Sequence, residues 1–372
     1  MKPIIYDLNL KELTDLITES GKSAYLAKQI WQMIYRQSAE DPSEFSNLSE
    51  DLRQKLSDRF CFKPLSVDKD LKSADGQTNK FLFRLQDDRK IESVLIRYTS
   101  LRFPTRNSDD RMTESVLKLE RERNTVCIST QVGCPMNCAF CATGQMGFIR
   151  NLSAGEIVAQ VLFVSRLLKS KGLKLGNIVV MGMGEPFYNY DAVMKAVDIL
   201  CDPKGMGFSE RKITISTVGI VPRIEQFTAE KHQVNLAVSL HAPSNAVRDQ
   251  IIPVNKKYPL DSLLEACRNY TEKTERRILF EYTLIHGLND DYENAELLCR
   301  RLKGMPCQVN LIPLNDTKKY EGSGADQDRL QSFKSVLDKN GIPCTVRLKR
   351  GIDIDAGCGQ LAAEQSGPCG DI

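Results

Sequence analysis

From Thr125 onward, six short apolar segments typical of β-strands alternate with longer segments of helical periodicity. A helix between two strands returns the chain to the same edge of the sheet, so such a series builds parallel strands. We therefore predict an α/β fold in which this part of the chain forms a partial (β/α)6 barrel of the TIM type. The expected strands are 125–130, 177–182, 212–217, 234–240, 278–285 and 307–313.

The expected helices include 153–172 and 262–273, and Ser153 followed by Glu156 predicts a capping box at the start of the first. Before the barrel, apolar residues recur every three or four positions in segments between residues 10 and 56, which predicts a small helical domain reaching to about residue 70. Residues 80–98 alternate in two runs around Asp87 and Asp88, which predicts a β-hairpin. We divide the chain into a helical accessory domain, a hairpin with a linker inserted at 99–111, the barrel and a C-terminal loop, at 1–75, 76–112, 113–350 and 351–372.

The composition narrows the class of protein but does not identify its binding partners. A net charge of +3 is only mildly basic, so it permits a polyanionic partner and does not imply one. No apolar run approaches the ~18 residues of a membrane span, and the N-terminus lacks a signal peptide, so we expect a cytoplasmic protein with no membrane partner. Twelve cysteines in such a chain favour reduced thiols for metal binding or catalysis over a disulfide framework.

Polar and glycine-rich residues follow the predicted strands, where barrel enzymes place their chemistry. Gly184 and Glu185 follow the second strand, and Asn315 follows the last. Serines end the third and fourth strands. For a single loop such residues could be turn formers alone, but these four strand ends, together with a cysteine-rich loop after the first strand, favour a site.

Three cysteines occupy the loop after the first strand: Cys134, Cys138 and Cys141. A structural zinc site fills four tetrahedral positions, so zinc would need Cys127 or a distant histidine as well. A [4Fe-4S] cluster has four irons. Three thiolates leave one iron open to another ligand, and the spacing on one loop favours this reading.

This spacing after a first barrel strand resembles the radical S-adenosylmethionine (SAM) superfamily. The stretches CISTQVGCPMNCAFCATGQMGF, VVMGMGEPFYN, RKITISTVGIVP, NLAVSLHAP, VNLIPLN and RGIDIDAGCGQLA more narrowly resemble the RlmN group of ribosomal RNA adenine-C2 methyltransferases. The resemblance covers nearly the whole chain. It implies a radical SAM partial (β/α)6 barrel with an RNA-binding N-terminal helical domain.

The resemblance also implies the activity, the cofactors and the substrates. The reaction would be methylation of C2 of an A2503-type adenine in the peptidyl transferase centre of 23S rRNA, and of a 37-type adenine in tRNAs. One [4Fe-4S] cluster would bind Cys134, Cys138 and Cys141. SAM would bind Gly184, Glu185, Ser216, Ser239, Leu240, His241 and Asn315, although His241 could instead be a structural histidine.

In the scheme implied by the resemblance, Cys358 takes a methyl group from one SAM and becomes S-methylcysteine. A second SAM, cleaved by the cluster, activates that methyl group for addition to C2. A glutamate then removes the C2 proton, and Cys127 attacks Cys358 to release the product, forming a transient disulfide. Other cysteines, such as Cys201, we interpret as ordinary small apolar residues.

Glu92 matches the family's base in the second hairpin strand, but Glu114 repeats the Glu-Ser-Val-Leu tetrapeptide closer to Cys127. We favour Glu92, because residues 87–91 complete the hairpin before it.

Partners and alternatives complete the expectations. We expect a monomer that takes electrons from an external flavodoxin-type donor. The basic residues expected to contact RNA are Lys22, Lys28, Arg36, Arg121, Arg123, Arg347, Lys349 and Arg350. The alternatives are a C8-directed adenine methyltransferase of the same group and a non-catalytic RNA-binding iron–sulfur or zinc protein, which would not need Cys127 and Cys358.

Overall fold

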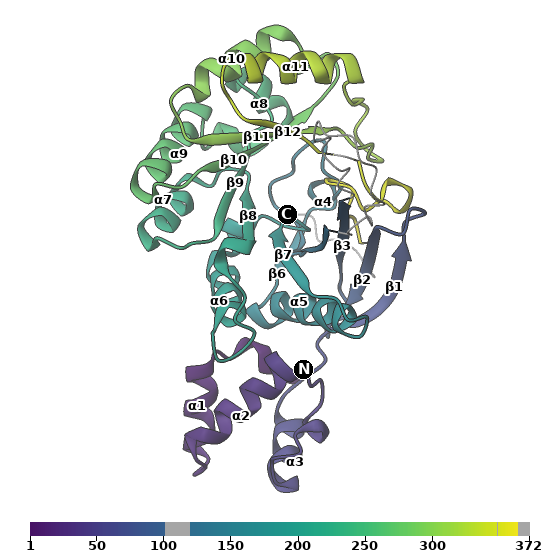
Figure 1. The fold of residues 1–372 in the computed structure, drawn as a ribbon, viewed down its shortest axis with the longest axis vertical. Coiled ribbons are helices and arrows are strands. Elements are labelled where there is room, and N and C mark those ends of the chain that lie inside the picture. The colour runs from purple at the N-terminus through teal and green to yellow at the C-terminus, as the bar shows by residue number, and fades with distance from the viewer. Residues whose placement is uncertain (101–119, 348, 364–372) are drawn as a thin grey trace, which may run out of the picture.

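The computed structural model describes residues 1–100, 120–347 and 349–363, and it has the predicted α/β architecture (Figure 1). Ten strands form one sheet in the order β1-β2-β3-β4-β7-β8-β9-β10-β11-β12. Their bounds are β1 Ser66–Lys72, β2 Thr78–Arg84, β3 Lys90–Ser100, β4 Glu120–Cys127, β7 Leu175–Val180, β8 Ile213–Thr217, β9 Asn235–Ser239, β10 Ile278–Leu284, β11 Cys307–Pro313 and β12 Cys344–Val346.

Within this sheet β4 and β7 to β12 are parallel, and all six predicted barrel strands are present. The partial barrel is therefore confirmed, with β12 added as a short seventh parallel strand. The edges β1 and β12 do not pair within the described chain, so the barrel is open. A smaller sheet pairs β5 (Gln131–Gly133) with β6 (Phe148–Asn151) beside the cysteine loop.

Helices cover the outer face of the parallel strands (Figure 1). They are α5 Ala154–Lys169, α6 Tyr190–Cys201, α7 Val221–Glu230, α8 Asn245–Ile251, α9 Leu260–Thr274, α10 Tyr292–Leu302 and α11 Gln327–Lys339, whereas the short helix α4 Ala142–Gln145 directly follows Cys141. The predicted capping box of α5 is confirmed, because Ser153 N donates to Glu156 Oε2 at 2.9 Å and Glu156 N donates to Ser153 Oγ at 3.2 Å. Short turns of helix lie at Ile5–Asp7, Met33–Gln37, Pro42–Glu44, Pro186–Asn189, Glu210–Lys212, Pro253–Lys256 and Ile352–Ile354.

The N-terminal domain is helical as predicted, with α1 Leu10–Glu19, α2 Ala24–Gln32 and α3 Glu50–Arg59. Its predicted extent is wrong, because residues 66–72 form β1, which pairs antiparallel with β2. The segment SVDKDLK is mostly exposed and charged, as protected edge strands often are, so its pattern gives no apolar alternation to detect.

The predicted hairpin is confirmed as β2 and β3 around residues 85–89. It also continues the barrel sheet, because β3 pairs antiparallel with β4, with Val94 opposite Cys127. Glu114 and residues 101–111 of the predicted insert lie outside the described residues. No helix in the described ranges is long and apolar enough to cross a membrane.

Contacts with α5 fix the N-terminal domain below the barrel (Figure 1). The carboxylate of Asp7 accepts the Gly155 N–H at 2.6 Å, at the first turn of α5. Arg166, near the end of α5, pairs with Glu40 at 2.9 Å and donates to Ser38 O at 3.1 Å. The accessory domain is thus anchored at both ends of the helix that follows the cysteine loop.

Candidate active site

A cavity lies at the carboxyl ends of the parallel strands, where the sequence predicts the active site. Among the residues that line this strand-end cavity are Cys134, Cys138, Cys141, Gly184, Glu185, Ser216, Ser239, His241, Asn315 and Cys358. Of the predicted cofactor residues, Leu240 alone does not line it. Leu240 is buried behind it, and its N–H donates to Glu281 O at 3.0 Å.

The cysteine loop is held by backbone hydrogen bonds. Cys134 N donates to Gly147 O at 2.8 Å, and Cys141 N donates to Cys138 O at 3.1 Å. Burial raises the pKa of Cys134 and of Cys138, so both are neutral thiols until a metal displaces their protons.

The cysteines fit a cluster better than a single ion. All three cysteines line the strand-end cavity. No group of three His, Cys, Asp or Glu side chains in the described ranges could hold one metal ion. A four-iron cluster separates its thiolate ligands more widely, and three soft donors suit it.

Glu185 presents a buried carboxylate to the same cavity. Its Oε1 accepts Phe187 N at 2.9 Å, and its Oε2 accepts Val218 N at 2.8 Å. Burial raises its pKa to about 7, and the backbone donors lower it. A cationic group bound nearby would favour the ionised form.

At Gly184 the backbone lies close to Gln131 of β5. Its φ is +103°, and a Cβ here would lie 2.6 Å from the Cβ of Gln131. The side chain of Gln131 accepts Glu185 N at 2.8 Å, so the glycine lets β5 pack against this loop.

The imidazole of His241 is neutral and accepts a hydrogen bond from the backbone. Burial lowers its pKa to about 3, and its Nδ1 accepts Thr283 N at 2.9 Å. The proton of the neutral ring therefore lies on Nε2. His241 thus lines the cavity and also bonds to β10, and its binding of SAM stays a prediction.

Asn315 joins the cavity to the C-terminal loop, which we define as residues 351–363. Its Nδ2 donates to Cys358 O at 3.0 Å. Its Oδ1 is buried and has no hydrogen-bond partner among the described residues. That free acceptor fits a ligand donor in the cavity.

Cys127 interacts electrostatically with Cys358. It ends β4 and is buried, opposite Val179 of β7. Burial, with a smaller effect of the Cys358 charge, raises the pKa of Cys127 to about 12, and Arg347 lowers it. Burial also raises the pKa of Cys358, and Arg347 is the main group that opposes this.

Arg347 and Glu281 complete the surroundings of the two thiols. Arg347 Nη1 lies 4.0 Å from Glu281 Oε2. The charge of Cys358 is the largest cause of the raised pKa of Arg347. The sequence predicts Arg347 as an RNA contact and does not single out Glu281, although a carboxylate inside the apolar run ILFEYTLI is a detectable signal.

Comparisons with known proteins agree with this geometry. Residues 128–298 match the Radical SAM superfamily, and residues 5–62 match the ribosomal RNA large subunit methyltransferase N-terminal domain. The dual-specificity RNA methyltransferase RlmN 1 of Myxococcus xanthus is 44% identical over 359 residues, 96% of this chain and 94% of its own length. This chain belongs to the RlmN family of radical SAM RNA methyltransferases.

Further relatives support the same conclusion over the whole chain. A probable dual-specificity RNA methyltransferase RlmN of Geobacillus kaustophilus is 42% identical over 98% of this chain and 93% of its own length. A crystal structure of a radical SAM methyltransferase from Sphaerobacter thermophilus superposes with a TM-score of 0.89. It is 45% identical and covers 97% of this chain and 100% of its own. As a member of this family, the protein is an enzyme that uses a [4Fe-4S] cluster and SAM.

Glu92, the predicted base of this RlmN family member, lies in neither the strand-end cavity nor the basic cavity defined below. It lines a hairpin cavity together with Lys80, Gln145, Asp355 and Gln360. Its Oε1 pairs with Lys80 Nζ at 3.2 Å, and its Oε2 accepts Ala362 N at 2.9 Å. The C-terminal loop therefore contacts this carboxylate through Ala362, whereas its Cys358 lines the other two cavities.

A basic cavity adjoins the strand-end cavity and shares Cys358, Asn315 and Ile312 with it. Its basic lining residues are Arg123, Lys212, Arg347, Lys349 and Arg350. Tyr98 lines it too, with Arg123 Cζ 5.4 Å and Arg350 Cζ 4.9 Å from its ring centroid. Lys212 and Tyr98 are not among the RNA contacts that the sequence predicts.

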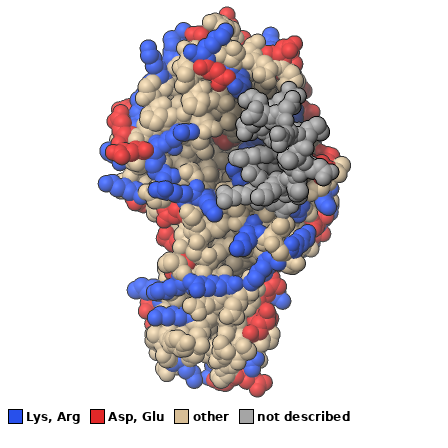
Figure 2. Space-filling view, in the orientation of Figure 1, with Lys and Arg blue, Asp and Glu red and all other residues tan. Residues whose placement is uncertain are grey.

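Four further basic residues are predicted to contact RNA: Arg36, Lys22, Lys28 and Arg121. Arg36 donates to Pro203 O at 2.6 Å and to Gly205 O at 3.1 Å, so it holds the accessory domain against the barrel. Lys22 and Lys28 are exposed. The side chain of Arg121 lies outside the described part. Figure 2 shows Lys and Arg side chains crossing the face where the helical domain meets the barrel.

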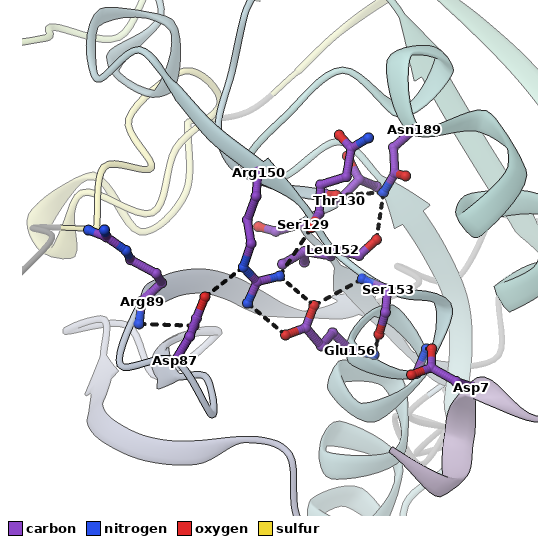
Figure 3. A network of polar contacts seen from close by, with 12 residues as sticks. Asp7, Asp87, Arg89, Ser129, Thr130, Arg150, Leu152, Ser153, Glu156 and Asn189 are labelled. Carbon is purple, nitrogen blue, oxygen red and sulfur yellow. Dashed lines mark hydrogen bonds and ion pairs between the residues drawn. The ribbon is translucent and has the colours of Figure 1, made fainter. Parts of the chain in front are cut away.

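Arg150 of β6 links the hairpin to the cysteine loop (Figure 3). Its Nε donates to Asp87 Oδ2 at 2.7 Å, and its two terminal nitrogens donate to the Glu156 carboxylate at 2.8 and 2.9 Å. One side chain therefore connects the hairpin turn, the strand after the cysteine loop and the start of α5.

Proposed function

We propose that this enzyme methylates C2 of an A2503-type adenine in 23S rRNA and of a 37-type adenine in tRNAs. Cys358 would carry the methyl group as S-methylcysteine, with two SAM molecules used per product. The observation that supports this most is the position of Cys358, which lines both the strand-end cavity and the basic cavity. A group at this position can receive a methyl from a cofactor on one side and deliver it to a base on the other.

The cluster and SAM, when bound, supply the methyl group and the one-electron chemistry that an electron-poor carbon requires. Cys134, Cys138 and Cys141 would hold the cluster. Glu185, Ser216, Ser239, His241 and Asn315 would bind SAM around it. The chain contributes orientation, exclusion of water and the two redox thiols.

Cys127 is proposed to release the product by attacking the Cys358 sulfur, which forms a disulfide between them. Its burial beside Cys358 supports this pairing. Attack needs a thiolate. Arg347 lowers the pKa of both thiols and is the available group to favour that form.

Glu92 is proposed as the base that takes the C2 proton. Burial raises its pKa above the ordinary value, which suits a proton acceptor. It would reach the substrate after the C-terminal loop releases its carboxylate from Ala362 N. Loss of methylation in Glu92→Gln with full activity in Glu114→Gln is the expected result. The reverse result would move the role to Glu114.

The basic cavity is proposed to admit the target nucleotide, unstacked from its RNA. Five cations suit the phosphates on either side of the base, and Tyr98 offers an aromatic face. The enzyme is further proposed to act as a monomer with a flavodoxin-type electron donor.

The experiment is anaerobic reconstitution with iron and sulfide, then incubation with SAM, a reductant and unmodified 23S rRNA or tRNA. Mass spectrometry of the nucleosides should find 2-methyladenosine. It should be lost in Cys358→Ala and retained in Cys201→Ala, because Cys201 ends α6 outside both cavities.

The other products decide against parts of the proposal. 8-Methyladenosine would contradict the C2 assignment and favour the C8-directed alternative. 5′-Deoxyadenosine without any methylated adenosine would contradict the RNA substrates and leave the cofactor chemistry intact.

A further inference from the structure

Arg248 of α8 is completely buried behind the strand-end cavity. Its Nε donates to Leu240 O at 3.0 Å, and its Nη2 donates to Val218 O at 2.6 Å and to Ser239 O at 3.2 Å. These carbonyls lie at and just beyond the ends of β8 and β9. The guanidinium thus fixes the backbone that carries two predicted cofactor residues, Ser239 and His241.

The positive charge of Arg248 has no carboxylate in contact with it. No ion pair within 4.0 Å includes Arg248 in the described ranges, and its fourth partner is the neutral Asn255, whose Oδ1 accepts Nη1 at 2.9 Å. Asn255 Nδ2 donates in turn to Asp249 Oδ1 at 2.7 Å, so the nearest linked carboxylate is one amide away. Burying an unpaired charge is costly, and proteins rarely do so without a counter-charge.

The counter-charge is not supplied by the described side chains, but the cysteine loop is adjacent. Ile251, three residues after Arg248, accepts Ala139 N at 3.0 Å, which joins α8 to the loop between Cys138 and Cys141. Val218 and Ser239, whose carbonyls accept hydrogen bonds from Arg248, line the same cavity as Cys138. Burial lowers the pKa of Arg248 itself only to about 10, so it stays charged near neutral pH.

We propose that Arg248 is a positioning and electrostatic residue that acts through the cysteine loop. Its buried positive charge compensates the negative charge of the thiolate-bound cluster. This interaction raises the reduction potential of the cluster. Each electron taken up adds one negative charge to the cluster. A fixed buried cation stabilises the reduced form more than the oxidised form, because charge interactions are weakly screened in the interior. Nothing in the sequence pattern indicates this role, since Arg248 reads as an ordinary polar residue of a short helix.

The test is an EPR-monitored redox titration of the reconstituted enzyme, without RNA. Arg248→Met removes the charge at similar volume, and Arg248→Lys keeps it. We expect the reduction equilibrium of Arg248→Met to fall about tenfold, which is about 59 mV for a one-electron couple. Arg248→Lys should stay near the wild-type potential.

A control and a second variant keep the test decisive. The control is Arg268→Met, which removes another arginine that donates to backbone carbonyls, those of Arg301 and Lys303. These carbonyls precede the amino end of β11, whereas the strand-end cavity lies at the carboxyl ends of the strands. This variant should leave the potential unchanged. The double variant Asn255→Asp with Asp249→Asn retains Arg248 but places a carboxylate directly on it, and should lower the potential. This variant decides the question if Arg248→Met does not fold.

The outcomes separate charge from architecture. Equal potentials in wild type and Arg248→Met, or an equal fall in Arg248→Lys and Arg248→Met, would overturn the electrostatic role. An unchanged potential in the double variant would overturn it too. SAM affinity, measured by calorimetry, should fall in both Arg248 variants, because both lose guanidinium hydrogen bonds to the carbonyls of Val218, Ser239 and Leu240. This measurement is independent of the potential.

Discussion

At the residue scale, Glu185 controls the charge of the strand-end cavity near neutral pH. Its carboxylate is buried and bonded to two backbone N–H groups, and its pKa is about 7. A small change in pH or a bound cation therefore changes its ionisation.

We expect SAM affinity to rise about ninefold between pH 6 and pH 8, because the ionised fraction of a group with pKa near 7 rises from about a tenth to nine tenths. Glu185→Gln should bind SAM weakly and without this rise. Calorimetric titration at several pH values measures it. Equal pH dependence in wild type and variant would show that the carboxylate does not contact the cofactor's ammonium.

The same group has an opposite effect on the stability of the ligand-free fold. Because its folded pKa lies above the ordinary value, the folded state binds the proton more tightly than the unfolded chain. Its stabilising effect is complete below the ordinary pKa and is lost as pH rises through about 7. Cofactor and stability thus favour different protonation states of one residue.

Arg347 lowers the pKa of both Cys358 and Cys127. We expect Arg347→Met to slow methyl transfer to Cys358 about tenfold at pH 7, and to shift the pH profile of this step upward. Intact-protein mass spectrometry without RNA measures the methylated chain. Arg350→Met is the matched control, since Arg350 lines the same basic cavity and stacks on Tyr98. An equal loss in both variants would assign the effect to the cavity as a whole.

At the element scale, one arginine adds a contact between the hairpin turn and the start of α5, beyond the pairing of β3 with β4. Arg150 bonds the hairpin turn through Asp87 and the first turn of α5 through Glu156, and all three groups are partly or largely buried (Figure 3). Charge-assisted pairs of this kind are strong, and breaking one leaves a carboxylate without its partner. The strand that carries Glu92 follows that turn.

We expect Arg150→Met to lower the free energy of unfolding by about 2 kcal/mol. Hydrogen exchange should speed up at residues 85–91, because the turn loses its anchor. Urea denaturation and exchange measured by mass spectrometry test this. Lys11→Met removes an exposed pair with Asp15 and should change stability by less than about 0.5 kcal/mol. Unchanged exchange at the turn would contradict the anchoring role.

At the scale of the whole molecule, the helical domain is attached to the barrel through α5. Arg166 pairs with Glu40 and bonds Ser38 O, while Asp7 accepts the Gly155 N–H at the other end of the helix. The same helix begins just after the cysteine loop. The domain is thus held at a fixed position relative to the cavities.

We expect Arg166→Met to raise the KM for RNA about tenfold while SAM affinity stays within about twofold, because the cavities lie in the barrel and the helical domain would hold RNA. Steady-state kinetics with tRNA and calorimetry with SAM measure the two effects. A parallel loss of SAM affinity would mean that the contact supports the barrel itself.

The sequence by itself determined the parallel strands, the capping of α5, the cysteine loop and most of the cavity residues. These depend on periodicity and spacing over a few residues, which local sequence encodes directly. It could not find β1, whose exposed charged residues lack apolar alternation, or β12, which is only three residues long.

Only the tertiary structure decided which distant groups meet. The carboxylate of Glu92 lies against Ala362, 270 residues away, rather than in the cavity with Cys358. The cation of Arg248 reaches the ends of β8 and β9 from a short helix. Such contacts depend on how whole elements pack, because a side chain's neighbours across the fold leave no period or spacing in the chain.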